Sequence, residues 1–328
     1  MRRSRFVRQA CAVALGAAIV RTAASAAGPQ VRFITVASES GVAPVYAADE
    51  GMFRSAGLDV TVTQLANGGS VLPAVIGGSA DFGVSNPISL ATAFARGAPI
   101  ACIAATVYYR KESSTSLLMV ANESAIRTAR DLNGKTIAVN GLRNTPQLST
   151  QAWIDANGGD SATVKFAEIS FFEMGAALLS GRVDAAFFAE PMLSEVRSRL
   201  RVLGDPYSAI APQFITGAFF TTLTYAADHP DIVGRVAAVL RAAGAWANAH
   251  PHETAIILAR VEKLDVDRVE KMARSRYAEQ LRASDLQPPI DVALKYGVLK
   301  APLAASAMIW TPPKSDAPER GGFVPNEV

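Results

Sequence analysis

The most constraining feature of this chain is a junction that occurs four times: a short apolar strand, a run of Ser, Asn, Thr or Gly, and a predicted helix start. The strands cover residues 31–36, 81–84, 136–139 and 164–169, and the polar runs begin at Ser38, Ser85, Asn140 and Ser170. Each junction places free backbone N–H groups and small polar side chains at the carboxyl end of a strand, where open α/β sheets bind ligands. Because the junctions occur in both halves of the chain, they predict two sheets that face one cleft.

The amino terminus predicts export from the cytoplasm. Four arginines among the first eight residues precede an apolar run over residues 10–20, and small residues follow up to Ala26 and Ala27. This order is typical of a signal peptide, so we expect residues 1–27 to be removed. The pair Arg2 and Arg3 leaves the twin-arginine route open beside the general route. No later stretch is long and apolar enough to cross a bilayer.

The charge balance changes once this segment is set aside. The chain has 32 Lys and Arg against 29 Asp and Glu, but its first 27 residues hold five Arg and no acid. The mature chain is therefore slightly acidic, which argues against a nucleic-acid surface. Only Cys102 remains after processing, so we expect no intramolecular disulfide, and stability must come from the apolar core.

Hydrophobic periodicity predicts an α/β fold. Residues 58–62 alternate as a strand, residues 71–77 and 88–96 have the pattern of helices that end at glycine, and residues 100–107 and 116–120 have the pattern of strands. This alternation is typical of an α/β fold, in which helices cover the faces of a sheet.

Two crossings between the sheets divide the chain. We place the first crossing in the polar segment 108–115, and the strand that leads back at residues 219–225. The predicted parts are a signal peptide (1–27), a discontinuous lobe I (28–112 and 218–310), lobe II (113–217) and a flexible tail (311–328) that is rich in Pro and Gly.

The candidate ligand-binding residues lie mainly in the junctions. Capping of helix starts explains most of these residue types by itself, so a purely structural role stays open for each of them. The candidates are Ser38, Ser40, Gly41, Asn67, Ser70, Ser85, Asn86, Thr106, Asn140, Asn144, Thr145, Glu190 and Phe214. For Asp81 and Asp184, which begin strands after a glycine turn, we favour a structural role.

Glu190 differs from the other candidates because it carries a charge to the carboxyl end of an apolar strand. In the cleft it would accept a hydrogen bond from an amine of the solute, or pair with Arg143 or Arg110. Either arginine in the cleft would indicate an anionic solute, because an unpaired buried guanidinium is costly. By default both arginines are exposed loop charges.

Aromatic residues near the junctions leave two roles open. Stacking on an aromatic solute is one role, and core packing is the other and the more common one. The residues concerned are Tyr108, Tyr109, Phe171, Phe172 and Phe214.

Patterns typical of catalysis are absent from the sequence. There is no Gly-x-Ser-x-Gly, His-Glu-x-x-His, dinucleotide-binding or phosphate-loop motif. The three histidines, His229, His250 and His252, lie at predicted helix borders and have no metal-ligand spacing, so we expect no metal and no cofactor. Cys102 lies inside an apolar strand, which favours an inert core position.

Five segments together resemble one protein family, the NMT1/THI5-like class of nitrate, sulfonate and taurine substrate-binding proteins of ABC importers. The segments are residues 41–60, 77–83, 131–139 and 179–186 and the pair Glu190 and Pro191. The resemblance implies an α/β, two-lobed periplasmic binding protein fold of type II, with two mixed sheets flanked by helices and two hinge crossings. It also implies a periplasmic, monomeric receptor that closes on a small solute and delivers it to an ABC permease in the inner membrane, with its cytoplasmic ATPase.

Several alternatives stay open within this resemblance. A sulfonate, taurine or nitrate type anion is the favoured solute, followed by a thiamine-related pyrimidine and an aromatic carboxylate. Thiamine-pyrimidine synthases resemble the same family, but they are cytosolic and carry a cysteine-rich motif that this chain lacks. A periplasmic partner of a sensor is the third class. We expect a binding protein rather than an enzyme.

Overall fold

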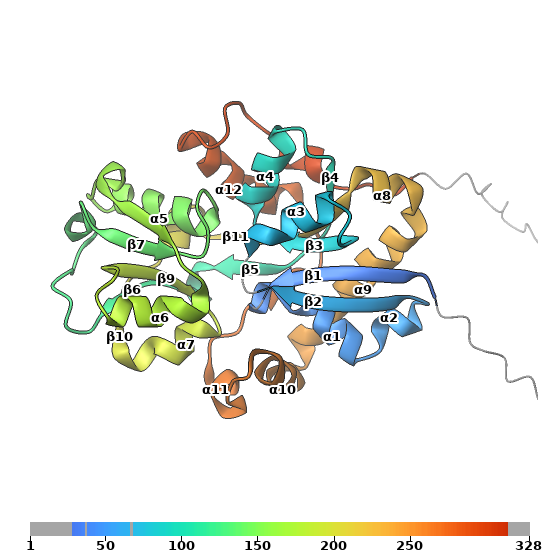
Figure 1. The fold of residues 1–328 in the computed structure, drawn as a ribbon, viewed down its shortest axis with the longest axis horizontal. Coiled ribbons are helices and arrows are strands. Elements are labelled where there is room, and N and C mark those ends of the chain that lie inside the picture. Colours follow the sequence, from blue (N-terminus) through green and yellow to red (C-terminus); the bar gives the residue numbers. More distant parts are fainter. Residues whose placement is uncertain (1–27, 37, 66–67, 314–328) are drawn as a thin grey trace, which may run out of the picture.

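The computed structural model describes residues 28–36, 38–65 and 68–313, and these form two lobes with a small sheet between them (Figure 1). The predicted signal peptide, Asn67 and residues 314–328 of the predicted tail lie outside the described residues. In the described part of the chain, no helix has the length and apolarity needed to cross a membrane.

The sheet of lobe I has five strands in the order β2-β1-β3-β12-β4. Strand β1 is parallel to β2 and β3, whereas β12 is antiparallel to β3 and β4. The strands are β1 (Gln30–Val36), β2 (Asp59–Leu65), β3 (Phe82–Ser85), β4 (Ile100–Ala105) and β12 (Ala218–Thr222). Strand β12 of this sheet therefore comes from the second half of the chain.

The sheet of lobe II repeats this plan in the order β10-β6-β9-β7-β8. Strand β7 is parallel to β8 and β9, and β6 is antiparallel to β9 and β10. The strands are β6 (Ser116–Ala121), β7 (Thr136–Val139), β8 (Lys165–Glu168), β9 (Ala185–Ala189) and β10 (Leu200–Gly204). Both sheets are mixed, as the sequence predicts.

Twelve helices accompany the sheets in the described residues. Those of lobe I are α1 (Ala43–Asp49), α2 (Met52–Ser55), α3 (Val71–Ile76), α4 (Pro87–Ala95), α8 (Leu223–Asp228), α9 (Pro230–Ala249), α10 (Pro251–Glu262), α11 (Val266–Lys271) and α12 (Ala283–Lys295). Those of lobe II are α5 (Thr145–Ala156), α6 (Phe171–Leu179) and α7 (Met192–Val196).

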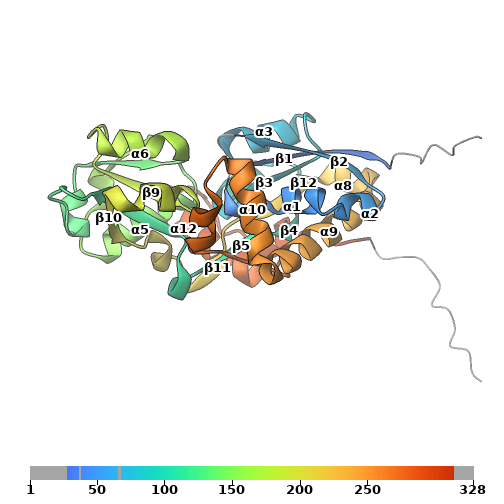
Figure 2. The same ribbon diagram turned by 90° about the horizontal axis from the view of Figure 1, so that it is seen from below.

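A small sheet of three strands lies between the lobes: β5 (Val107–Arg110), β11 (Gln213–Ile215) and β13 (Arg276–Tyr277), in the order β11-β5-β13. Figure 1 and Figure 2 show β5 and β11 running between the two lobes. Both partners of β5 pair antiparallel to it. The chain passes between the lobes at β5 and β11, the two crossings that the sequence predicts, whereas β13 lies between two helices of lobe I, α11 and α12.

Two predicted strands need correction at their ends. The predicted strand 219–225 stops at Thr222, because the Thr222 side chain accepts a hydrogen bond from Tyr225 N at 3.1 Å and begins α8. The predicted strand 100–107 is interrupted at Thr106, whose backbone N and Oγ1 both donate to Gly217 O. The polar segment after it forms β5 as far as Arg110.

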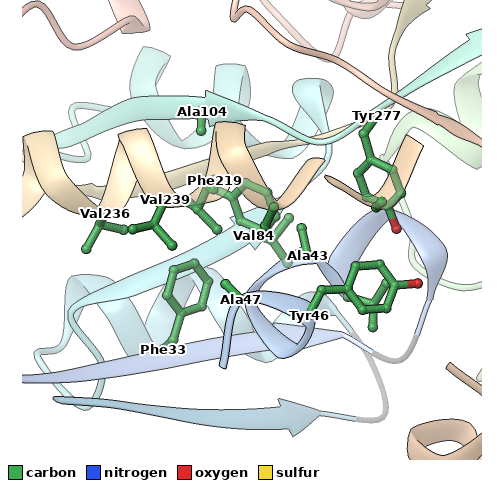
Figure 3. Packing of buried hydrophobic residues seen from close by; sticks show 14 of the residues in the cluster. Phe33, Ala43, Tyr46, Ala47, Val84, Ala104, Phe219, Val236, Val239 and Tyr277 are labelled. Carbon is green, nitrogen blue, oxygen red and sulfur yellow. The ribbon is translucent and has the colours of Figure 1, made fainter. Parts of the chain in front are cut away.

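The largest core cluster packs α1 and α9 against one face of the lobe I sheet (Figure 3). Phe33, Phe82 and Phe219 are fully buried there, and the Phe33 and Phe219 rings meet edge to face with centroids 5.7 Å apart. On the opposite face, a Cβ on Gly83 would lie 2.6 Å from Val71 Cγ1, so only glycine lets α3 approach this closely. The sheet is thus covered on both faces.

We expect Phe219→Ala to lower the free energy of unfolding by about 3–5 kcal/mol, because the ring leaves a cavity in this core. Urea denaturation followed by tryptophan fluorescence measures the loss. Leu223→Ala is the matched control, since Leu223 lies four positions away with 48% of its surface exposed, and it should cost less than about 1 kcal/mol. Equal losses would show that the cluster does not carry this part of the stability.

Candidate functional site

A cavity of about 120 Å³ lies between the lobes, at the carboxyl ends of β1 and β3 on one side and of β7 and β9 on the other. Its walls come from both lobes and from the crossing strands. Seven of the thirteen candidate residues line it: Ser38, Ser40, Ser85, Asn86, Asn140, Asn144 and Glu190. The junctions that dominate the sequence therefore converge on one place in the structure.

The wall from lobe I consists mainly of neutral hydrogen-bonding groups. Ser38 Oγ and Ser40 Oγ lie 3.1 Å apart, and Ser85 lines the cavity beside them. Asn86 Oδ1 accepts hydrogen bonds from Ser89 N at 3.0 Å and from Thr145 Oγ1 at 3.0 Å. Asn86 thus caps α4 and also joins the lobes.

The wall from lobe II is built in the same way. Asn144 Oδ1 accepts from Gln147 N at 3.1 Å and caps α5, and Asn144 Nδ2 donates to Asn140 Oδ1 at 3.0 Å. The first turns of α4, α5 and α6 reach the cavity through Asn86, Pro146 and Phe171. The positive ends of three helix dipoles therefore face this space.

Glu190 is the charged candidate that reaches the cavity. Its side chain is almost fully buried, and its carboxylate accepts hydrogen bonds from Ser194 N at 3.0 Å and from Ser194 Oγ at 2.9 Å. Burial raises the pKa of Glu190 to about 7, although the bonds from Ser194 oppose this rise. In the described residues it forms no ion pair, so of the two alternatives open for Glu190, pairing with Arg143 or Arg110 does not occur in this structure.

Neither candidate arginine lines the cavity. Arg110 Nε donates to Glu112 Oε1 at 2.8 Å, and Arg143 is an exposed residue with φ of 56° at the end of a loop. No Lys or Arg is among the described residues that line the cavity. The helix starts described above are therefore the groups with partial positive charge that face the cavity.

A second carboxylate, Glu39, also lines the cavity and was not a candidate from the sequence. Arg274 Nε donates to Glu39 Oε1 at 2.6 Å, and Ser275 N donates to Glu39 Oε2 at 2.9 Å. The ion pair with Arg274 compensates the charge of Glu39, which nevertheless adds to the rise in the pKa of Glu190. The junction at Ser38 marked this loop, but no sequence pattern connects it to Arg274.

Residues of the crossing segments complete the cavity. Thr115 Oγ1 and Ser275 Oγ lie 3.1 Å apart. Other lining residues that sequence reasoning missed are Ser116, Phe187, Tyr207, Thr216 and Gly217. These residues lie outside the four junctions, so no local signal marked them.

The other candidates that the structure describes are not among the residues that line the cavity. Gly41 O accepts from Thr35 Oγ1, Thr106 Oγ1 donates to Gly217 O at 2.9 Å, and Thr145 bonds to Asn86. Ser70 is exposed at the start of α3, and Asn67 lies outside the described residues. Phe214 packs in the core against Tyr109 and Tyr207. A ligand contact for these residues stays a prediction.

The aromatic residues that the sequence offered for stacking on a solute differ in whether they reach the cavity. Phe171 lines the cavity, whereas Phe172 is half exposed outside it. Tyr108 and Tyr109 donate to Asp285 and Asp205 instead. Phe171 is therefore the one of these aromatic candidates that lines the cavity, where Tyr207 and Phe187 also lie.

Three residues whose side chains have catalytic potential, Cys102, Asp81 and Asp184, are buried or bonded to the backbone in this structure. Burial raises the pKa of the Cys102 thiol to about 12, so the reactive thiolate is not formed at neutral pH. Asp81 and Asp184 accept hydrogen bonds from the backbone of neighbouring strands, at Arg32 N and Thr136 N. Within the described ranges, no group of three or more His, Cys, Asp or Glu side chains is placed to hold a metal ion.

Comparisons with known proteins agree on one fold. The sequence model of the NMT1/THI5-like family matches residues 39–254. A search among curated protein sequences finds no match.

Solved structures resemble the chain over most of its length. The periplasmic aliphatic sulphonate binding protein SsuA from Escherichia coli has a TM-score of 0.72 at 19% identity, over 91% of this chain and 97% of that one. The alkanesulfonate-binding protein SsuA from Xanthomonas axonopodis pv. citri, bound to MOPS, has a TM-score of 0.72 at 21% identity, over 86% of this chain and 98% of that one. The periplasmic nitrate-binding protein NrtA from Synechocystis PCC 6803 has a TM-score of 0.70 at 14% identity, over 85% of this chain and 84% of that one. The predicted periplasmic binding protein fold is confirmed.

We expect Glu190→Gln to become more stable relative to wild type as the pH rises. A solvated glutamate has a carboxyl pKa of 4.5, whereas the pKa of Glu190 is about 7 in the folded protein. The stabilisation from the protonated group is therefore complete below the unfolded pKa and is lost as the pH rises through the folded pKa. The amide does not titrate, so between about pH 5 and about pH 8 the difference should move by about 2 kcal/mol in favour of the variant.

Urea denaturation at both pH values measures this difference. The exposed carboxylate Glu253 provides the control variant Glu253→Gln, whose difference from wild type should stay constant. A constant difference for Glu190→Gln as well would show that Glu190 is charged and well solvated in the folded protein.

Proposed function

Because the chain belongs to the NMT1/THI5-like family, we propose that it is the periplasmic solute-binding component of an ABC importer. It captures a small solute between its lobes and delivers it to a permease in the inner membrane. The observation that carries this proposal is the convergence of Ser38, Ser85, Asn86, Asn140 and Asn144 on one cavity. Neutral dipoles bind a polar solute strongly enough to capture it and do not react with it.

Capture depends on contacts that both lobes share. Asn86 of lobe I and Thr145 of lobe II are joined by a hydrogen bond at 3.0 Å. Tyr296 Oη in lobe I donates to Asp155 Oδ2 in lobe II at 2.6 Å. A solute that bonds to both walls favours the arrangement in which these contacts form, and the permease distinguishes that arrangement from the open one.

The charges of the cavity favour a solute that carries an amino group. Glu39 is neutralised by Arg274, so Glu190 is the carboxylate left for the solute. A nitrate or alkanesulfonate ion gains from the three helix termini but is repelled by an ionised Glu190. Taurine or a thiamine-related aminopyrimidine adds a donor for that carboxylate. We therefore place these two ahead of simple anions.

The similar structures named above are sulfonate- and nitrate-binding proteins, and the cavity presents no activated nucleophile among its described lining residues. We propose a non-catalytic role on these grounds. The export signal predicted for residues 1–27 supports the periplasmic location and argues against the cytosolic synthase alternative.

Taurine should stabilise the protein, and isethionate should do so much less, since isethionate has a hydroxyl in place of the amino group. A differential thermal shift screen tests this on protein that has been unfolded and refolded to remove bound solute. A solute at about a hundred times its dissociation constant adds about 2.7 kcal/mol to stability. An aminopyrimidine and its analogue without the amino group form a second matched pair, and nitrate is included. Stronger binding of nitrate or isethionate would overturn the choice of an amino solute.

Substitutions of two neighbouring wall residues should separate binding from stability. Ser85→Ala removes a hydroxyl that lines the cavity, so solute affinity should fall about fivefold or more with little change in unfolding. Asn86→Ala removes the α4 cap as well, so it should also lower stability by about 1 kcal/mol. Calorimetric titration with the solute found in the screen, and urea denaturation, measure the two effects. Unchanged affinity in both variants would contradict this site.

A further inference from the structure

A second cavity, of about 360 Å³, lies beside the solute cavity and shares Phe171 with it. One wall comes from α6 and α7 of lobe II, and the other comes from the end of α10 and the turn after it in lobe I. Most of the lining is apolar, with Phe172, Leu179, Met192, Val196 and Leu264 among its residues. Leu264 packs against the apolar clusters of both lobes, so this cavity also lies where the lobes meet.

A buried carboxylate interrupts this apolar lining. Glu262, at the end of α10, is 8% exposed and lines the cavity. Among the described residues its carboxylate accepts one hydrogen bond, a long one of 3.3 Å from Gln64 Nε2. Burial raises the pKa of Glu262 to about 7, and no basic side chain opposes that rise. A carboxylate in such a setting is stabilised by a cationic partner.

The other charges near this cavity do not supply that partner. Glu195 lines the cavity too, but it accepts from Arg268 Nη1 at 2.6 Å across the lobes. Arg199 lines the cavity as an exposed residue and forms no ion pair with Glu262 in the described chain. The site thus offers one carboxylate with acceptor capacity at the end of an apolar surface.

We propose that this cavity is a second ligand site, which takes a small molecule with an apolar body and a primary ammonium group. The ammonium group would donate to Glu262, and the body would lie along α6 between Phe172 and Leu179. Such a ligand would contact both lobes through α6 and Leu264. This site is distinct from the solute cavity, and its occupant need not be the transported solute.

Phenethylamine is a direct probe of this proposal. Its binding to the purified protein is measured by ligand-observed NMR and by titration of backbone amide shifts. 2-Phenylethanol and phenylacetate share the aromatic body but lack the positive charge, so they should bind at least about tenfold more weakly. Glu262→Gln keeps the shape of the side chain and should weaken phenethylamine binding by about the same factor.

Two further variants separate this site from the solute cavity. Ala176→Phe, at an exposed position of α6 that lines the second cavity, should fill the space and abolish binding. Glu190→Gln alters the solute cavity alone and should leave binding unchanged. The proposal is overturned if wild type does not bind phenethylamine, if phenylacetate binds as well, or if Glu190→Gln removes the binding while Glu262→Gln and Ala176→Phe keep it. Should Glu262→Gln fail to fold, Ala176→Phe and Glu190→Gln decide the question.

Discussion

The ion pair between Glu39 and Arg274 is the interaction on which the solute cavity depends. The Glu39 side chain is 3% exposed, so its charge would be very costly without a partner. Arg274 neutralises this charge and also donates to Pro251 O and to Thr254 Oγ1 at the start of α10. Tyr277 Oη donates to the backbone carbonyl of Glu39 at 2.9 Å. One short segment therefore holds the cavity loop, α10 and strand β13 together.

This arrangement also determines which charge a solute meets. With Glu39 neutralised, Glu190 on the opposite wall is the carboxylate that still lacks a basic partner among the described residues. A series of hydrogen bonds leads from the Glu39 carboxylate to the backbone of Glu190: Ser275 N donates to Glu39, Ser275 Oγ meets Thr115 Oγ1, and Glu190 N donates to Thr115 O. The series crosses from lobe I to lobe II beside β5. The two walls of the cavity are thus connected through the crossing segment as well as through the solute.

Local signals predicted the parts of the site that depend on neighbours in sequence. Asn86 and Asn144 were predicted as site residues because each follows a strand and precedes a helix that begins near a proline. Each of them caps its helix. The same logic placed Ser70 and Thr145 among the candidates, since a capping pattern does not reveal whether a side chain reaches a cavity. The interruption at Thr106 escaped prediction because it depends on Gly217, 111 residues away.

The sequence alone determined the alternating strands and helices, because periodicity, capping and glycine placement act within a few residues. Five of its segments also indicated the family, and with it the two mixed sheets. It also placed Glu190 at the end of its strand. Only the tertiary structure decided that Glu39 pairs with Arg274, 235 positions away, that neither Arg110 nor Arg143 lines the cavity, and that Glu262 lies beside α6. Such contacts depend on how the lobes pack, and the charge that a cavity presents is the sum of residues brought together by that packing.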